Sequence, residues 1–292
     1  MFMNKRYISV DCGCFRKYGS IKEIIKLLKD SGFTAYDASM FTGGILDDLI
    51  FADNWEEQVK DLRAYADSIG IVCNQSHAPF ASAKINDEKH NEWMFPRLVR
   101  ALEVSSILGA KVCVVHPCND WNAEENAELY KRLEPFARKV GVKIGLENMW
   151  NCIGWRTPEF KILPAACSHH DDFKAHLDLL PSDVFVACVD LGHAELTGLN
   201  TSAVEMIETL SDRLEAIHLH DVDLVHDNHQ MPFTQRIIWA KVIEALRKVG
   251  YKGDITLETS DAIRCAPKEL IPHTAKYLAA IANYFKDEIE KE

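Results

Sequence analysis

The sequence lacks any apolar stretch long enough to cross a membrane, since it contains no window of about 18 consecutive apolar residues. Its amino end, MFMNKRYISVD, also lacks the apolar segment of a secretory signal and passes directly into a strand pattern. We therefore expect a cytoplasmic protein that does not insert into a membrane.

Basic charge is also scarce, because 33 Lys and Arg residues stand against 44 Asp and Glu residues, for a net charge of −11. A surface of this sign repels phosphate backbones, which argues against nucleic acid as the main partner. The sequence contains no glycine-rich phosphate loop, no dinucleotide-binding fingerprint and no G-x-S-x-G motif. The common signatures of nucleotide-binding and serine-hydrolase sites are therefore missing.

The nine cysteines lack a regular spacing, and their number is odd. Cys12 and Cys14 are two residues apart on a predicted strand, so they point the same way without forming a zinc knuckle. We interpret most of the nine as reduced core residues, because free cysteine is commonly buried. This interpretation implies a reducing compartment.

The sequence does contain a regular alternation of short β-rich segments and longer helical segments. The predicted strands are residues 7–11, 35–39, 71–77, 111–116, 143–148, 184–190, 214–220 and 254–258. The predicted helices are residues 20–31, 55–69, 88–108, 123–140, 171–179, 201–210, 237–249 and 267–287.

Several predicted strands are near-continuous apolar runs, such as VCVV at 112–115 and VFVACV at 184–189. Parallel strands that are covered on both faces have this composition. Glycine follows several predicted helices, as expected of helix ends, at Gly32, Gly70, Gly109, Gly141 and Gly250. Eight alternating units favour a closed barrel over an open sheet. We therefore predict an α/β protein with one domain, a (β/α)8 TIM barrel that spans residues 1–292.

Six consecutive predicted strands, the third to the eighth, each end in a histidine or an acidic residue. These residues are His77, His116, Glu147, Asp190, the pair His218 and His220, and Glu258. The carboxyl ends of barrel strands meet at one mouth, where the active sites of such barrels lie. Buried acids and histidines are costly unless they are paired or bind metal. Their convergence predicts a divalent metal site, although each residue alone also suits a turn, a cap or an ion pair.

Three further features lie near these strand ends. His218 and His220 are two residues apart, so both side chains point to the same side of the seventh strand. The next loop contains Asp227 and His229, a D-x-H pair that either folds over the metal or belongs to a solvated polar loop. Trp150 follows the fifth strand, where its ring either walls a pocket for the apolar face of a sugar or contributes to packing.

Six short motifs occur in order along the strand ends: HAPF at 77–80, LEN at 146–148, VDLGH at 189–193, HLHD at 218–221, D-N-H at 227–229 and LET at 257–259. With them the sequence resembles the xylose-isomerase-like TIM-barrel superfamily, and within it the sugar phosphate isomerase/epimerase group. The resemblance implies one metal held by Glu147, Asp190, one of His218 or His220, and Glu258. It also implies that His193 contacts the substrate, and we expect His77 and Trp150 to do the same.

The sequence is also similar to the endonuclease IV family within this superfamily. That similarity implies three zinc ions, with His77, His116, Asp227 and His229 added to the ligands. The continuations LENMW and LGHAEL depart from the nuclease pattern, and no basic loop for insertion into DNA is evident. The segment VDLVHD lacks the arginine that ketose 3-epimerases place after the histidine of strand 7, so the substrate stays open.

Three functions are compatible with these residues. The first is a metal-dependent sugar isomerase or epimerase in which Glu147 and Glu258 serve as base and acid beside a metal-bound carbonyl. The second is a multi-zinc phosphodiesterase, which the number of bound metals distinguishes from the first. The third is a non-catalytic binding barrel. We predict the first, with Mn²⁺ or Zn²⁺ as the main candidate metals, Mg²⁺ or Co²⁺ also suitable, and a small sugar as partner; a homo-oligomer stays open.

Overall fold

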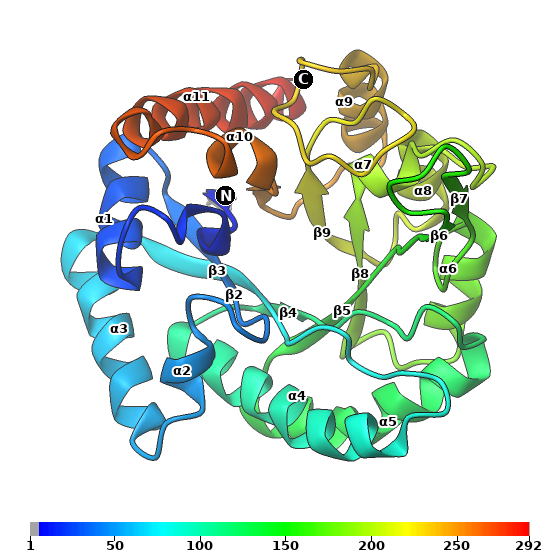
Figure 1. The fold of residues 1–292 in the computed structure, drawn as a ribbon, viewed down its shortest axis with the longest axis horizontal. Helices are drawn as coiled ribbons and strands as arrows, with labels where there is room; N and C mark the ends of the chain where they lie inside the picture. The colour runs from blue at the N-terminus through cyan, green and yellow to red at the C-terminus, as the bar shows by residue number, and fades with distance from the viewer. Residues whose placement is uncertain (1–5, 292) are drawn as a thin grey trace.

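The computed structural model describes residues 6–291, which form a barrel of eight parallel strands inside a ring of helices (Figure 1). The strands are β1 (Ile8–Val10), β2 (Ala35–Ser39), β3 (Val72–His77), β4 (Val112–Val114), β5 (Lys143–Glu147), β8 (Phe185–Asp190), β9 (Leu214–Leu219) and β10 (Ile255–Leu257). They pair in the order β1, β10, β9, β8, β5, β4, β3, β2. The two ends of this order meet at a parallel bridge between Asp11 and Asp37. The prediction of a (β/α)8 barrel is confirmed.

The main helices have close to the predicted bounds. They are α1 (Ile21–Ser31), α3 (Trp55–Ile69), α4 (Glu88–Leu108), α5 (Ala123–Val140), α6 (His170–Asp178), α8 (Ala203–Thr209), α9 (Trp239–Lys248) and α11 (Ile271–Glu290). Ser20 begins α1 with a capping box, in which the Glu23 carboxylate accepts from the Ser20 amide at 2.7 Å. Gly32 ends the same helix with a φ of 106°, which glycine adopts without strain. Among residues 6–291, no helix combines the length and the apolar character that crossing a membrane requires.

The expectation that Cys12 and Cys14 lie on a strand is wrong. Both belong to the 3₁₀ helix η1 (Cys12–Phe15), which begins directly after β1. The cause is Asp11, whose carboxylate accepts a hydrogen bond from the Gly13 amide at 2.7 Å and so turns the chain. Cys12 is buried in the core, whereas Cys14 is only partly buried.

The last predicted helix begins later than expected. Residues 267–287 divide into η2 (Lys268–Leu270) and α11, and the short helix α10 (Ser260–Arg264) comes before them. A proline lies in the first turn of α11, where a missing backbone N–H costs no helical hydrogen bond. The other short elements are α2 (Asp47–Ile50), α7 (Leu191–Ala194) and a hairpin of β6 (Asn151–Ile153) and β7 (Lys161–Leu163).

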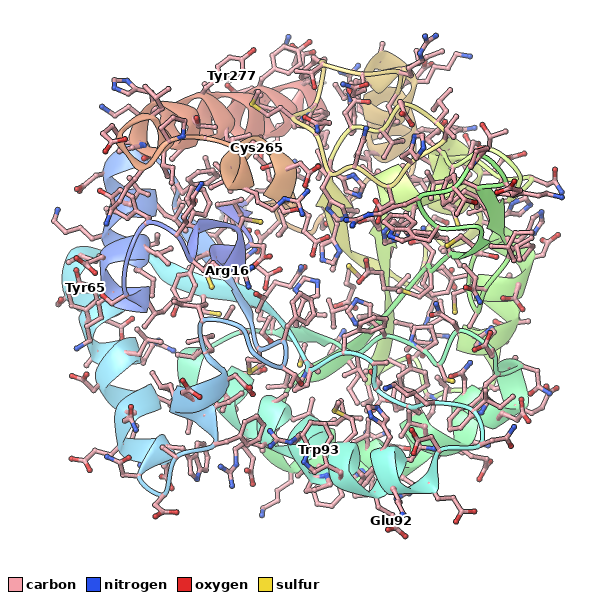
Figure 2. The ribbon with its side chains drawn as sticks, viewed as in Figure 1. Arg16, Tyr65, Glu92, Trp93, Cys265 and Tyr277 are labelled. Carbon is pink, nitrogen blue, oxygen red and sulfur yellow. The ribbon has the colours of Figure 1, made fainter. Side chains whose placement is uncertain are left out.

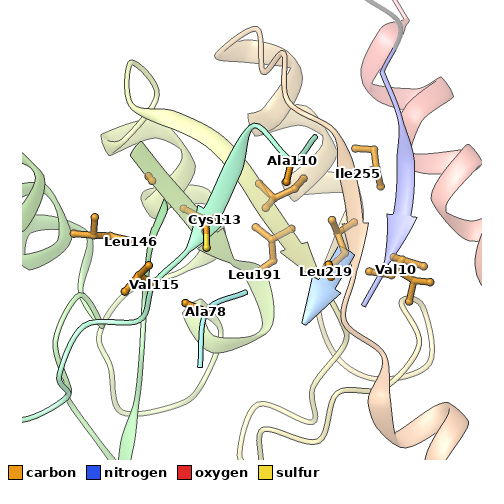
Figure 3. Close-up of a cluster of buried hydrophobic side chains, with 14 of the residues drawn as sticks. Val10, Ala78, Ala110, Cys113, Val115, Leu146, Leu191, Leu219 and Ile255 are labelled. Carbon is orange, nitrogen blue, oxygen red and sulfur yellow. The ribbon is translucent and has the colours of Figure 1, made fainter. Parts of the chain in front are cut away.

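Hydrophobic side chains fill two spaces. The larger core lies between the barrel and the helices, and Figure 3 shows part of it, including Val10, Cys113, Val115 and Leu146. The smaller cluster consists of Val112, Val114, Val186, Cys188 and Ala216. Side chains alternate between the two faces of a strand, so the next positions on the face of the smaller cluster are His116, Asp190 and His218. The apolar cluster therefore forms a floor beneath the polar side chains of the barrel mouth.

Candidate metal centre

The barrel mouth opens into a cavity of about 810 Å³. The site residues predicted from the sequence that line it are His116, Glu147, Trp150, His193, Asp227, His229 and Glu258. The other four, His77, Asp190, His218 and His220, are fully buried. Arg16 also lines the cavity, and Figure 2 shows it near the centre of the ring, whereas Tyr65, Trp93 and Tyr277 lie on the outer helices.

The first ligand group consists of Glu147, Asp190, His218 and Glu258, each of which offers an atom within 4.8 Å of the others. Nδ1 of His218 lies 3.1 Å from Oε1 of Glu147, 3.9 Å from Asp190 and 4.0 Å from Glu258. Of the two histidines near the end of β9, the one that belongs to this group is therefore His218.

The second ligand group consists of His77, His116 and Glu147. Nε2 of His116 lies 3.0 Å from Oε2 of Glu147, and Nε2 of His77 lies 3.9 Å from the same oxygen. Nε2 of His77 is also 3.2 Å from Oε1 of Glu258. Glu147 therefore contributes one carboxylate oxygen to the first group and the other to the second.

The third ligand group consists of His193, His220, Asp227 and His229. Oδ2 of Asp227 lies 3.3 Å from Nε2 of His193 and 3.2 Å from Nε2 of His229, and it accepts a hydrogen bond from Nε1 of Trp150 at 3.1 Å. The D-x-H loop therefore folds over the barrel mouth, and the interpretation as a solvated loop is wrong.

Asp221 explains why this loop folds back. Its buried carboxylate accepts hydrogen bonds from the amides of Gln235 and Ile237 and from Nε1 of Trp239, all at 3.0 Å. The Asp221 backbone also pairs with Gln230 in an antiparallel bridge. The last residue of the HLHD motif thus holds the loop in place, and it does so as a structural residue.

His220 lies between the first and third groups. Its Nε2 is 2.9 Å from Oδ1 of Asp190, and its ring stacks on that of His229 at 3.9 Å between centroids. Gly192 leaves room for this ring, because a Cβ there would overlap it. The carboxylate of Asp190 also caps α7 by accepting from the His193 amide at 2.7 Å. The metal-site and capping interpretations of Asp190 are therefore compatible.

The orientation of the histidines suits metal binding. Nδ1 of His193 lies 2.9 Å from the Asn148 carbonyl, and Nδ1 of His229 lies 2.8 Å from the Glu258 carbonyl. A carbonyl oxygen only accepts, so both rings carry a proton on Nδ1 and turn Nε2 toward Asp227. Metal-binding histidines commonly have their second nitrogen fixed in this way.

Several buried polar atoms in the three groups converge without bonding to each other. Among residues 6–291, Nε2 of His77, Oε2 of Glu147 and Oδ1 of Asp227 have no partner in hydrogen-bonding geometry. This holds even though His77 and Glu147 each have oppositely charged neighbours within 4 Å. Unpaired buried polar atoms are costly, and a shared cation satisfies atoms that point toward a common space. The donor set therefore fits a divalent metal.

Residues 25–281 match the family model of the xylose isomerase-like TIM barrel. The chain belongs to this family. It is 28% identical over 207 residues to an uncharacterized protein of Methanocaldococcus jannaschii, and this alignment covers 66% of each chain. A D-tagatose 3-epimerase-like protein has a similar structure, with a TM-score of 0.74, 18% identity and coverage of 97% of this chain and 98% of that one. The IOLI protein with a bound zinc atom has a TM-score of 0.69 and 15% identity, and the similarity covers 97% of both chains.

Many ionisable side chains are buried together at the mouth of this xylose isomerase-like barrel. Burial raises the pKa of the Glu147 carboxyl, but His218 and His116 outweigh it and hold the pKa well below its ordinary value. For His229 burial alone would lower the pKa, but the Asp227 carboxylate and other acids outweigh burial and raise the pKa to about 10. Without metal, protons on the histidines therefore balance the carboxylates, and a divalent cation in the site would displace such protons.

Two acids in the barrel mouth were not predicted from the sequence. Asp11 lines the cavity, and Asp37 is fully buried beside His77. Asp11 could have been found, because it ends the predicted strand over 7–11 as other acids end the later strands. Asp37 lies in the middle of the predicted strand over 35–39, and an acid inside a strand buried on both faces is a signal of the same kind.

Proposed function

We propose that the protein is a divalent-metal-dependent isomerase or epimerase of a small sugar or sugar-like ketone. The observation that carries this proposal is the first ligand group, in which Glu147 and Glu258 flank His218 and Asp190 at the bottom of the cavity. Two carboxylates beside one metal position provide a base and an acid for proton transfer. The names of the structural neighbours, a D-tagatose 3-epimerase-like protein and a zinc-binding barrel, support the same class.

A cation in the first group, with Mn²⁺ or Zn²⁺ as the main candidates, would polarise a substrate carbonyl and make the neighbouring C–H more acidic. One of Glu147 and Glu258 removes that proton, and the other returns a proton to the same or the adjacent carbon. The partners of the two acids differ, since Glu147 contacts His116 and His218 whereas Glu258 contacts His77. The two carboxylates therefore lie at the same metal position but have different nearest histidines, which allows one to serve as base and the other as acid.

The cavity is suited to bind and orient a small sugar. Its volume lies in the range of small-molecule sites, and the rings of Phe41, Phe80 and Trp150 line it beside the polar groups. Aromatic faces pack against the apolar face of a sugar ring. His193 is buried and lines the cavity, and its Nε2 lies 3.3 Å from Oδ2 of Asp227. We assign His193 and Trp150 to substrate orientation. The sequence also predicted a substrate contact for His77, but this side chain is fully buried beneath the cavity lining and is better suited to the second ligand group.

Proton exchange with solvent tests this proposal. The Mn²⁺-loaded protein is incubated in deuterated water with a panel of ketoses, aldoses and inososes and their phosphates, and deuterium is located by NMR. We expect incorporation next to the carbonyl of at least one compound. Chelation and the double substitution of Glu147 and Glu258 by glutamine should abolish it, whereas Glu215→Gln, which removes an exposed carboxylate of β9, should leave it unchanged. Exchange that persists in the double variant would contradict the roles assigned to the two acids.

A second candidate function is a multi-metal phosphodiesterase. The observation in its favour is the presence of three adjoining ligand groups, because two or more metals suit the displacement of a phosphoester oxygen. The net charge of −11 weighs against a DNA substrate. Hydrolysis of bis(p-nitrophenyl) phosphate or of a duplex with an abasic site, without deuterium exchange on any sugar, would establish this function in place of the first.

A further inference from the structure

A buried chain of hydrogen bonds lies directly beneath the ligand groups. It begins at Asp37 in β2, whose side chain is inaccessible to solvent. Oδ2 of Asp37 lies 3.0 Å from Nδ1 of His77 and accepts a hydrogen bond from Nε2 of Gln75 at 3.0 Å. The same amide nitrogen of Gln75 lies 2.7 Å from Nε2 of His218. One carboxylate therefore reaches two histidines that belong to different ligand groups.

The backbone is arranged to make this contact. The pairing of β2 with β3 shifts register after Tyr36, so that Tyr36 pairs with Cys73 whereas Asp37 pairs with Gln75. Irregularities of this kind redirect side chains next to functional sites. The shift places the Asp37 carboxylate beside the Gln75 amide, and it turns both toward the interior of the barrel mouth.

Asp37, His77 and His218 offer atoms within 4.8 Å of one another and in that respect resemble a further metal site. The position between them is already filled, because the Gln75 amide nitrogen lies within 3.0 Å of both Asp37 and His218. An amide nitrogen donates hydrogen bonds and does not bind a cation. The three residues and Gln75 therefore form a polar layer beneath the metal groups, in which Gln75 is hydrogen-bonded to Asp37 and His218 and the His77 ring lies against Asp37.

A hydrophobic residue in place of Asp37 would stabilise the fold at least as well as the carboxylate does. The Asp37 carboxylate is fully buried, and its second oxygen has no hydrogen-bond partner among residues 6–291. Removing a carboxylate from water costs several kcal/mol unless it is compensated, and apolar residues of similar volume are often equally stable at such positions. Because burial of the Asp37 carboxylate costs stability, we expect this residue to serve the ligand groups that lie above it.

We propose that Asp37 is a positioning residue of the metal centre, which acts on His77. The Asp37 carboxylate lies 3.0 Å from Nδ1 of His77, so its negative charge favours a proton on that nitrogen, and Nε2 faces Glu147 and Glu258. Gln75 in turn holds the Asp37 carboxylate in place, because its amide donates a hydrogen bond to Oδ2. The inference rests on the proposed metal dependence, but it does not depend on which substrate is used.

Metal binding tests the proposal without an activity assay. Asp37→Asn keeps the size of the side chain and removes its charge. Asp254→Asn is the matched control, because Asp254 also accepts hydrogen bonds, from the Tyr7 amide and from Asn74, but lies at the amino end of β10. Each protein is titrated with Co²⁺ and followed by calorimetry and by the visible spectrum, with circular dichroism as the check on folding.

We expect Asp37→Asn to weaken Co²⁺ binding about 10- to 100-fold and to change the visible spectrum, as loss of a residue that orients metal ligands typically does. Asp254→Asn should match the unsubstituted protein in both. If Asp37→Asn does not fold, Gln75→Met keeps Asp37 and removes the amide that donates to its carboxylate, and it should also weaken binding and alter the spectrum.

An affinity and a spectrum equal to those of the unsubstituted protein, in a folded Asp37→Asn or Gln75→Met variant, would overturn the proposal. That result would leave the proposed isomerase function intact. The opposite result is also possible: the variants bind Co²⁺ with the expected order of affinities, but the unsubstituted protein exchanges no proton on any sugar. That result would contradict the proposed function and leave the role of Asp37 intact. Absence of metal binding by the unsubstituted protein would overturn both.

Discussion

Replacement of Glu147 by glutamine is the most informative single change in this barrel. One carboxylate oxygen of Glu147 contacts His218 at 3.1 Å and the other contacts His116 at 3.0 Å. The two histidines belong to different ligand groups. The substitution keeps the size of the side chain and removes a negative charge from both groups at once. Asp227→Asn is the comparison, because Asp227 belongs to the third group alone.

The expected magnitude follows from the charge that is lost. Two unit charges 4 Å apart near a protein surface interact by about 4 kcal/mol, so a carboxylate and a divalent ion interact by about 8 kcal/mol. The dehydration of both ions cancels much of this attraction. If about a third of it survives, the loss of about 2.7 kcal/mol lowers the metal affinity about 100-fold.

Thermal unfolding with and without metal measures this loss. Free metal at about 100 times its Kd stabilises the unsubstituted protein by about 2.7 kcal/mol, which raises the Tm of a chain of this size by about 4 °C. At the same metal concentration Glu147→Gln should gain only about 0.4 kcal/mol, or about 1 °C, whereas Asp227→Asn should keep most of the shift. An equal metal-induced shift in Glu147→Gln and in the unsubstituted protein would refute the shared role of Glu147.

Three other predictions concern the surroundings of the site. Burial and neighbouring carboxylates raise the pKa of Asp11 from 3.8 to about 6, so its ionisation in the chelated protein costs stability as the pH rises from about 4 to about 6. Asp11→Asn should raise the free energy of unfolding in urea at pH 7.5 by about 2–3 kcal/mol, and no increase would contradict this reasoning. Gly192→Ala would force a Cβ into the His220 ring and should destabilise the protein by about 1–3 kcal/mol; calorimetry that shows an unchanged Tm would refute it. Cys265 is the exposed cysteine (Figure 2) and should react first with iodoacetamide, whereas mass spectrometry that finds the first adduct elsewhere would be inconsistent with the fold.

The fold could be predicted from the sequence because the two periodic patterns alternate over the whole chain. Apolar runs such as 112–115 and 184–189 fix the strands, and glycines such as Gly32 fix the helix ends. The same pattern places the candidate ligands, since a strand assigned within one or two residues already identifies the side chain at its carboxyl end.

Some features of the site could not be predicted because they depend on contacts between distant segments. Which of His218 and His220 belongs to the first ligand group depends on the positions of Glu147 and Asp190 on two neighbouring strands. The hydrogen bonds from the β9–α9 loop to Asp221 are also absent from any local pattern. The role that we propose for Asp37 requires a register shift between β2 and β3, which a single sequence does not reveal.

The location of a bound cation tests the central claim most directly. Crystals soaked in Zn²⁺ are measured at the zinc absorption edge, and the anomalous difference map shows where the ion lies. We predict a peak about 2.0–2.2 Å from Glu147, Asp190, His218 and Glu258. A map without a peak among these four side chains, or with zinc bound only at the exterior of the barrel, would contradict the account.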